Sequence, residues 1–242
     1  MENENLYDKI KDYLGNSPDR FHIMENQIDI EVQMEYFEYS KRLKSQLETE
    51  KIINEKDNIF INELDEEYKK ELLVKLACID DVKAFRTIEK YLLNPNENLK
   101  NWASLALQES KMLLESKLLD ENQVFISTGL GGKNGKLRYF IVILSKGNAN
   151  LSETQKKIIK NEFDYILKKS DSEIEKLDFS DSLTTIVAII PISVTLKDLF
   201  NAAIDECNQY GNFLKKSFIV TNVKILSMDE IINILKDQNH DD

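Results

Sequence analysis

The hydrophobic pattern of the chain changes near residue 120, and this change restricts the folds that are open to it. Before residue 120, apolar residues recur at intervals of three and four, which is typical of amphipathic helices. After it, short runs rich in β-branched and aromatic residues, such as 136–145 and 183–193, alternate with helical patterns. The pattern predicts an α+β protein with an acidic, all-helical domain at 1–119 and a sheet domain at 120–242.

The clearest helical block covers residues 65–119. It contains three apolar-periodic segments, of which the second and third are separated by the break Asn94-Pro95-Asn96. Because the connections are short, the three helices are expected to pack antiparallel. The carboxylates Asp80 and Asp81 precede the second helix and are expected to cap it.

This block resembles HEAT-type helical repeats in the stretches LLVKLACIDD and VKAFRTIEKYLLNPNENLKNWASLAL. The repeat family has a helix with small residues, a tight acidic turn, a second helix, another turn and a further helix with small residues. The likeness covers a little over one repeat, whereas a stable solenoid needs about three. The resemblance therefore implies that residues 65–119 pack against something else, either the carboxyl half or another chain.

The carboxyl half is expected to be ferredoxin-like. Its predicted element order is β-β-α-β-β-α-β-α, and without the first strand and the last helix this order is βαββαβ, the split unit of ferredoxin-like folds. We expect an antiparallel sheet with helices on one face. Such a topology hosts many unrelated activities, so the resemblance implies no function by itself.

The net charge of −11, concentrated toward the amino end, bears on partners. An acidic chain repels nucleic acid and anionic membranes, so we expect neither as a partner, and a basic protein is the simplest complement. The sheet edges also allow a homodimer. No secretory signal and no membrane-length apolar run is present, and Cys78 and Cys207 lie in apolar helical patterns as buried thiols, which together predict a cytoplasmic protein.

The stretch TGLGGKNGKLRYF at 128–140 contains four of the seven glycines. It fails as a nucleotide-binding loop, because the glycine spacing is wrong and a strand rather than a helix follows. Asn134-Gly135 instead predicts a type I′ hairpin turn, with Lys133 opposite Lys136. Since the two facing lysines repel each other, an anion bound at the tip is an alternative hypothesis. Its ligands would be Gly129, Gly131, Gly132, Lys133, Gly135, Lys136 and Arg138.

The sequence predicts no catalytic residues, no metal site and no cofactor. His22 and His240 are the two histidines, too few for a zinc site, and neither lies in a pattern typical of a nucleophile and its base. A non-catalytic interaction or adaptor protein is therefore the first hypothesis, and an enzyme is disfavoured. Two alternatives stay open: a module that senses an anionic ligand or nucleotide through the hairpin 129–138, and a carboxylate- and metal-dependent enzyme.

Overall fold

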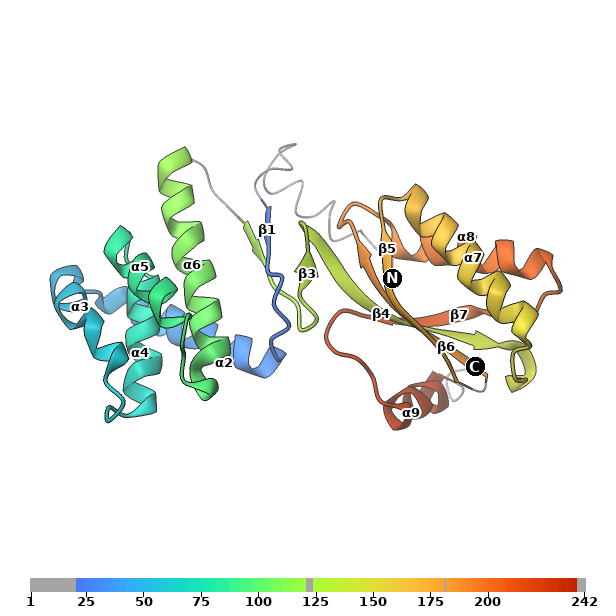
Figure 1. The fold of residues 1–242 in the computed structure, drawn as a ribbon, viewed down its shortest axis with the longest axis horizontal. Coiled ribbons are helices and arrows are strands. Elements are labelled where there is room, and N and C mark those ends of the chain that lie inside the picture. The colour runs from blue at the N-terminus through green and yellow to red at the C-terminus, as the bar shows by residue number, and fades with distance from the viewer. Residues whose placement is uncertain (1–20, 121–123, 181, 239–242) are drawn as a thin grey trace. The chain divides into compact units, whose positions relative to one another are not determined.

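A computed structural model describes residues 21–120, 124–180 and 182–238 and shows an α+β protein, which confirms the predicted fold class (Figure 1). The chain divides into two compact units between Ser127 and Thr128. The described residues 21–127 are called the helical unit here, and the described residues 128–238 are called the sheet unit. The predicted helical domain also includes residues 1–20, and the histidine His240 belongs to the tail; both lie outside the described residues.

Within the helical unit, one pair of strands departs from the all-helical prediction. Strand β1 (Phe21–Ile23) pairs in parallel with β2 (Val124–Ile126), so β2 belongs with the helices and not with the large sheet. This pairing joins residues about 100 positions apart, which no local pattern reveals. It also explains why the division between the units falls at Ser127.

The helices of this unit begin where the sequence places capping carboxylates. Asp29 accepts the N–H of Glu31, Asp65 accepts the N–H of Glu67, and Asp81 accepts the N–H of Lys83. The helices are α2 (Ile30–Leu43), α3 (Thr49–Glu55), α4 (Glu66–Ala77), α5 (Val82–Tyr91) and α6 (Lys100–Leu119), with 3₁₀ turns η2 (Lys44–Gln46), η3 (Lys56–Phe60) and η4 (Glu97–Leu99). Of the predicted pair Asp80-Asp81, Asp81 is the cap, and Asp80 forms an ion pair with Lys117 instead.

Trp102 of α6 lies in the core of the helical unit and is 2% exposed. Its indole N–H donates to the carbonyl of Lys70 at 3.0 Å, and its ring meets the rings of Tyr36 and Tyr39 edge-on, with centroids 5.3 and 5.2 Å away. This hydrogen bond to the indole N–H, the one polar group of the side chain, lowers the cost of burying the ring. Trp102 is therefore a core residue of this unit.

The sheet unit contains strands whose neighbouring pairs are all antiparallel. Strand β4 pairs with both β6 and β7, and β5 pairs with β6, so the long strands follow the order β7-β4-β6-β5. The short strand β3 pairs with the start of β4. The elements are β3 (Gly132–Lys133), β4 (Lys136–Ser145), η5 (Lys146–Asn148), α7 (Glu153–Lys169), β5 (Glu173–Ser180), β6 (Leu183–Ile190), α8 (Leu196–Gln209), β7 (Leu214–Thr221) and α9 (Met228–Gln238). The ferredoxin-like resemblance and the HEAT-like resemblance both stay predictions.

Helices cover both faces of this sheet, so the expectation of helices on one face is wrong (Figure 1). Alternate residues of β4 explain the difference, because Ile141 and Ile143 belong to the core formed with α7 and α8, whereas Phe140 and Val142 belong to the core that includes Ile231 of α9. A strand buried on both faces is apolar at consecutive positions. The run FIVIL in β4 has this pattern, which indicates that both faces of the sheet are covered.

Candidate functional site

The hairpin at 132–137 has the predicted turn and register. Asn134 and Gly135 have φ angles of 52° and 72°, and the pairs are Lys133 with Lys136 and Gly132 with Leu137. Both turn residues lie in the left-handed region that a type I′ turn requires. The repulsion between the facing lysines is therefore present in the structure and needs a counter-charge.

Carboxylates at and just before the start of β5 supply that counter-charge. Lys133 pairs with Glu173 at 2.5 Å, and Lys136 pairs with Asp171 at 2.8 Å. Arg138 holds Glu175 with two hydrogen bonds, of 2.5 and 3.1 Å, and the first of these is the main reason that the pKa of Glu175 is lowered. The three predicted cationic ligands thus already have anionic partners within the protein, and the proposed anion site at the hairpin stays an untested prediction.

Gly129 has a role of its own, which the sequence analysis did not identify. A Cβ atom built on it would lie 1.8 Å from the carbonyl oxygen of Val223, and the next residue, Leu130, donates its N–H to Asn222 at 3.0 Å. If the hairpin register continued, Gly129 would lie opposite Phe140, but Phe140 pairs with Thr221 of β7. The close backbone approach to Val223 therefore explains a glycine at this position.

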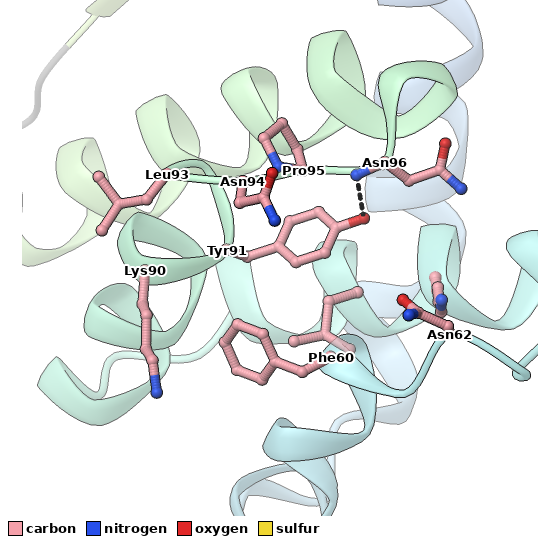
Figure 2. Close-up of a pocket in the computed structure, with 10 residues that line it drawn as sticks. Phe60, Asn62, Lys90, Tyr91, Leu93, Asn94, Pro95 and Asn96 are labelled. Atoms are coloured by element: carbon pink, nitrogen blue, oxygen red, sulfur yellow. Dashed lines mark hydrogen bonds between the residues drawn. The ribbon is translucent and has the colours of Figure 1, made fainter.

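A more promising site is an open pocket of about 630 Å³ in the helical unit (Figure 2). Its volume falls in the range of small-molecule sites. The walls come from η3 and the residues after it, from α4, from the end of α5 and from the turn between α5 and α6. The lining residues are Ile59, Phe60, Asn62, Lys69, Lys90, Tyr91, Leu93, Asn94, Pro95 and Asn96. They include two lysines and no carboxylate, in a protein whose net charge is −11.

Lys69 is the unusual member of the pocket lining. It is 4% exposed, and among the described residues its side chain has no hydrogen-bond or ion-pair partner. It lies in the first turn of α4, where Asp65 accepts the N–H groups of Glu67 and Tyr68. The stem of Lys69 is buried, and its side chain lines the open pocket without a partner among the described residues. Such a group is more easily explained by an anion that binds next to it.

The carboxylates closest in sequence to this lysine are occupied elsewhere. Asp65 caps its own helix by accepting the N–H of Glu67 at 3.1 Å. Glu66 accepts a hydrogen bond from the amide of Asn98 at 3.1 Å, and Glu67 accepts one from the hydroxyl of Tyr39. Glu71, two residues after Lys69, pairs with Lys75 at 3.1 Å. Four acidic residues therefore lie within about one turn of Lys69 along the chain, and none of them forms an ion pair with it.

Aromatic rings form the apolar wall of the pocket. The rings of Phe60 and Tyr91 lie edge-on with centroids 6.1 Å apart, and the ammonium of Lys90 lies 5.0 Å from the Phe60 centroid. Figure 2 shows the Tyr91 ring between Phe60 and the segment that ends at Asn96. This wall can cover the flat or apolar part of a ligand while the lysines face its charge.

The Tyr91 hydroxyl and three asparagine amides supply the neutral polar groups. The hydroxyl accepts the N–H of Asn96 at 3.2 Å, which leaves its own proton available for donation. Burial raises the pKa of Tyr91, the hydrogen bond from Asn96 lowers it and the nearby Glu66 raises it, so the pKa stays above its usual value and the phenol is neutral at pH 7. Asn62, Asn94 and Asn96 lie around the rim.

This set of donors suits an anion and does not suit a metal ion. Ammonium, phenol and amide groups donate hydrogen bonds to oxygen anions, whereas protein metal sites usually include carboxylate, imidazole or thiolate ligands, and this lining has none. Across the described residues, no group of three or more His, Cys, Asp or Glu side chains is arranged to hold a metal. The lining contains no Ser, Cys, His or carboxylate, so it offers neither a serine or cysteine nucleophile nor a histidine or carboxylate base.

A second buried polar cluster joins α2, α4 and α6 around Glu109. Its carboxylate accepts hydrogen bonds from Tyr36 and Ser40, both at 2.7 Å, and pairs with Lys44 at 2.9 Å. Tyr36 and Ser40 of α2 and Lys44, which directly follows α2, are spaced four residues apart, so they lie on one side. Burial and the charge of Glu109 raise the pKa of the Cys78 thiol to about 11, which keeps the thiol protonated at neutral pH. The cluster therefore ties helices together and lacks a reactive nucleophile.

Comparisons with known proteins give only distant structural likenesses. No protein-family model and no curated protein matches the chain. A "putative transposase" from Deinococcus radiodurans R1 aligns with a TM-score of 0.38 and 16% identity, over 44% of this chain and 94% of that one. A REP-associated tyrosine transposase bound to a REP hairpin gives 0.33 and 12%, over 44% and 70%. A homoserine dehydrogenase from Thiobacillus denitrificans gives 0.24 and 13%, over 53% and 29%.

The two transposases correct one expectation about partners. Net charge led us to exclude nucleic acid, and that exclusion is withdrawn because structures similar to part of this chain include a transposase bound to a REP hairpin. Likenesses at these TM-scores carry no positive argument about what this chain binds. Among the described residues, no helix is both long and apolar enough to span a membrane.

Proposed function

We propose that this chain is a non-catalytic binding protein whose helical unit captures an anionic group in the Lys69 pocket. One observation carries the proposal: a lysine that is 4% exposed lines the pocket and has no partner among the described residues. The lining adds a second lysine and no carboxylate. An anion there would form charge-assisted hydrogen bonds with an ammonium group that has no other partner among the described residues.

Carboxylate and phosphate share the chemistry that these groups recognise. Either can accept hydrogen bonds from Lys69, Lys90 and the Tyr91 hydroxyl, and the Phe60 and Tyr91 rings would cover an adjoining apolar or planar part of the ligand. The anion can belong to a free small molecule or to an acidic side chain of a partner protein. The second case is the adaptor role that the sequence analysis favours.

The test is a thermal-shift titration of the full chain at constant ionic strength. The probes are inorganic phosphate, citrate, AMP and a capped Asp-containing tripeptide, with sodium chloride as the blank. A probe at 100 times its Kd adds about 2.7 kcal/mol to stability, which raises the melting temperature by several degrees. We expect at least one probe to give such a shift, and we expect the shift to disappear in Lys69→Met.

The matched control is Lys75→Met. Lys75 is on the same helix, but it already pairs with Glu71 at 3.1 Å and does not line the pocket. This variant should keep the shift. Equal shifts in the wild type and in Lys69→Met, or no shift with any of the four probes, would contradict the proposal. A shift with the tripeptide alone would assign the anion to a partner protein, and a shift with phosphate, citrate or AMP would assign it to a small molecule.

A further inference from the structure

The sheet unit has two edges, and they differ in how they are protected against pairing with another strand. Strand β5 forms one edge, and it carries Glu173, Glu175 and Asp178 and has a register shift between Ile174 and Lys176. Charged side chains and irregular pairing are the usual means by which an edge strand is kept from adding further strands. The β5 edge is therefore protected.

Strand β7 forms the other edge, and its second half lacks this protection. Among the described strands it pairs with β4 alone. It begins with Lys215 and Lys216 but continues with Phe218, Ile219, Val220 and Thr221, which have high β-propensity and no charge. A regular, uncharged edge of this kind is a template for another extended segment.

A groove of about 430 Å³ lies beside this edge, between β7 and the first half of α8. Its apolar lining comes from Leu196, Phe218 and Val220, and its charged lining comes from Lys197 and Lys216. Lys216 also forms an exposed ion pair with Asp205 of α8 at 3.0 Å, which an incoming carboxylate would have to share or replace. Phe218 is held in place by Phe200 of α8, with ring centroids 5.4 Å apart. A strand added to β7 would point alternate side chains toward the α8 face, where this groove can receive one of them.

We infer that the β7 edge binds an extended segment of a partner protein in which an apolar residue is flanked by acidic residues. The backbone of the segment would pair with β7, its apolar side chain would enter the groove, and its carboxylates would meet Lys197 and Lys216. This is the mode of recognition in which backbone hydrogen bonds provide affinity and a pocket for alternate side chains provides specificity. A second copy of β7 fits less well, because it would bring two further lysines to a groove that already has two.

The experiment uses the ¹⁵N-labelled full chain and three capped heptapeptides. The first is Glu-Val-Glu-Val-Glu-Val-Glu, the second has Lys in place of Glu, and the third is the first peptide with every backbone amide N-methylated. The N-methylated peptide keeps the charges and the side chains but loses the N–H donors along both edges. We expect the first peptide alone to shift the amide signals of residues 216–221 and to slow their hydrogen exchange.

The double variant Lys197→Glu/Lys216→Glu tests the charge of the groove without disturbing the core, since both side chains lie at the surface. It should bind the acidic peptide about tenfold more weakly, because two favourable charge contacts become unfavourable. It should bind the lysine peptide more tightly than the wild type does. The variant Lys69→Met should bind as the wild type does, so this inference is independent of the proposed function.

Three outcomes would overturn the inference. The first is no change in the signals of residues 216–221 with the acidic peptide. The second is equal binding of the N-methylated peptide, which would exclude strand pairing. The third is a dimer in sedimentation experiments whose β7 amides are protected without any peptide, which would show that a second copy occupies the edge.

Discussion

At the scale of the residue, the surroundings explain two positions. Lys69 has no partner among the described residues, and Gly129 has no room for a side chain. Lys69 is buried in a pocket whose lining includes no carboxylate, and Gly129 lies against the backbone of Val223. The sequence did not distinguish either of them. Lys69 is one of two consecutive lysines in EEYKKELL, and its neighbour Lys70 pairs with Glu35 at 2.9 Å. Which of the two is buried without a partner depends on how η3 and the 94–96 turn pack around α4.

Replacing Lys69 by methionine should stabilise the protein while it removes anion binding. The variant keeps the apolar stem of the side chain and removes an ammonium group that has no partner among the described residues, so we expect the free energy of unfolding to rise slightly, by about 1 kcal/mol or less. Denaturant unfolding without added ligand measures this change. Lys75→Met, which breaks an exposed pair, should change stability by less than about 1 kcal/mol. A destabilised Lys69→Met would show that the ammonium group has a stabilising partner of its own.

Replacing Gly129 by alanine should destabilise the sheet unit. The added methyl group would lie 1.8 Å from the carbonyl oxygen of Val223, and main-chain atoms cannot yield as the end of a side chain can. We expect a loss of about 3 kcal/mol or more. Gly135→Ala is the comparison: its φ is +72° but no atom lies within 4 Å of the new Cβ, so the loss should be only about 1 kcal/mol. Equal losses in chemical denaturation would contradict the proposed backbone approach.

At the scale of the element, local sequence signals predicted where helices and turns begin, but not which surfaces meet. The Asp81 cap of α5 and the Asn134-Gly135 turn are both present in the structure, because each depends on residues within a few positions of each other. The parallel pairing of β1 with β2 and the packing of α9 on the second face of the sheet depend on distant residues. The Lys69 pocket has the same origin, since its walls come from four separate segments.

The cluster that joins α2, α4 and α6 makes a prediction about the reactivity of Cys78. Burial and Glu109 raise the pKa of this thiol from 9.0 to about 11. Because the pKa is higher in the folded state, the protonated thiol stabilises the fold below about pH 9, and this contribution is lost as the pH rises through about 11. The rate of alkylation by iodoacetamide, followed by peptide mapping, should therefore still be rising at pH 10.

The variant Glu109→Gln tests whether the charge of Glu109 contributes to the raised pKa of Cys78. Removing the negative charge should move the midpoint of the alkylation profile of Cys78 toward lower pH, with circular dichroism confirming that the variant stays folded at each pH. Cys207 serves as an internal reference in the same digest, because it is fully buried and its pKa is raised to about 12, mainly by burial. A rate for Cys78 that reaches its plateau near pH 9 would show that Glu109 does not act on this thiol.

At the scale of the whole molecule, each unit has its own core. One cluster of buried apolar residues belongs to the helical unit, and two clusters lie on opposite faces of the sheet. The change of pattern near residue 120 predicted domains at 1–119 and 120–242, and that division stays a prediction. The pattern could not predict that residues 124–127 remain with the helices, because that assignment follows from the partner of β2.

A fragment of residues 128–242 should therefore fold without the rest of the chain. It contains both faces of the sheet with the helices that cover them, and its length is that of a common single domain. We expect a single cooperative thermal transition and sharp amide signals that match those of the sheet unit in the full chain. A broad transition together with binding of a hydrophobic dye would contradict this expectation.

The protonated state of the two thiols also has a practical consequence. Cys78 and Cys207 are the only cysteines in the chain, and both have pKa values well above neutrality. A cysteine introduced at an exposed position of each unit would then react with a maleimide dye at pH 7 much faster than either native thiol. Fluorescence energy transfer between two such dyes could follow the distance between the units in solution, with the native cysteines left in place.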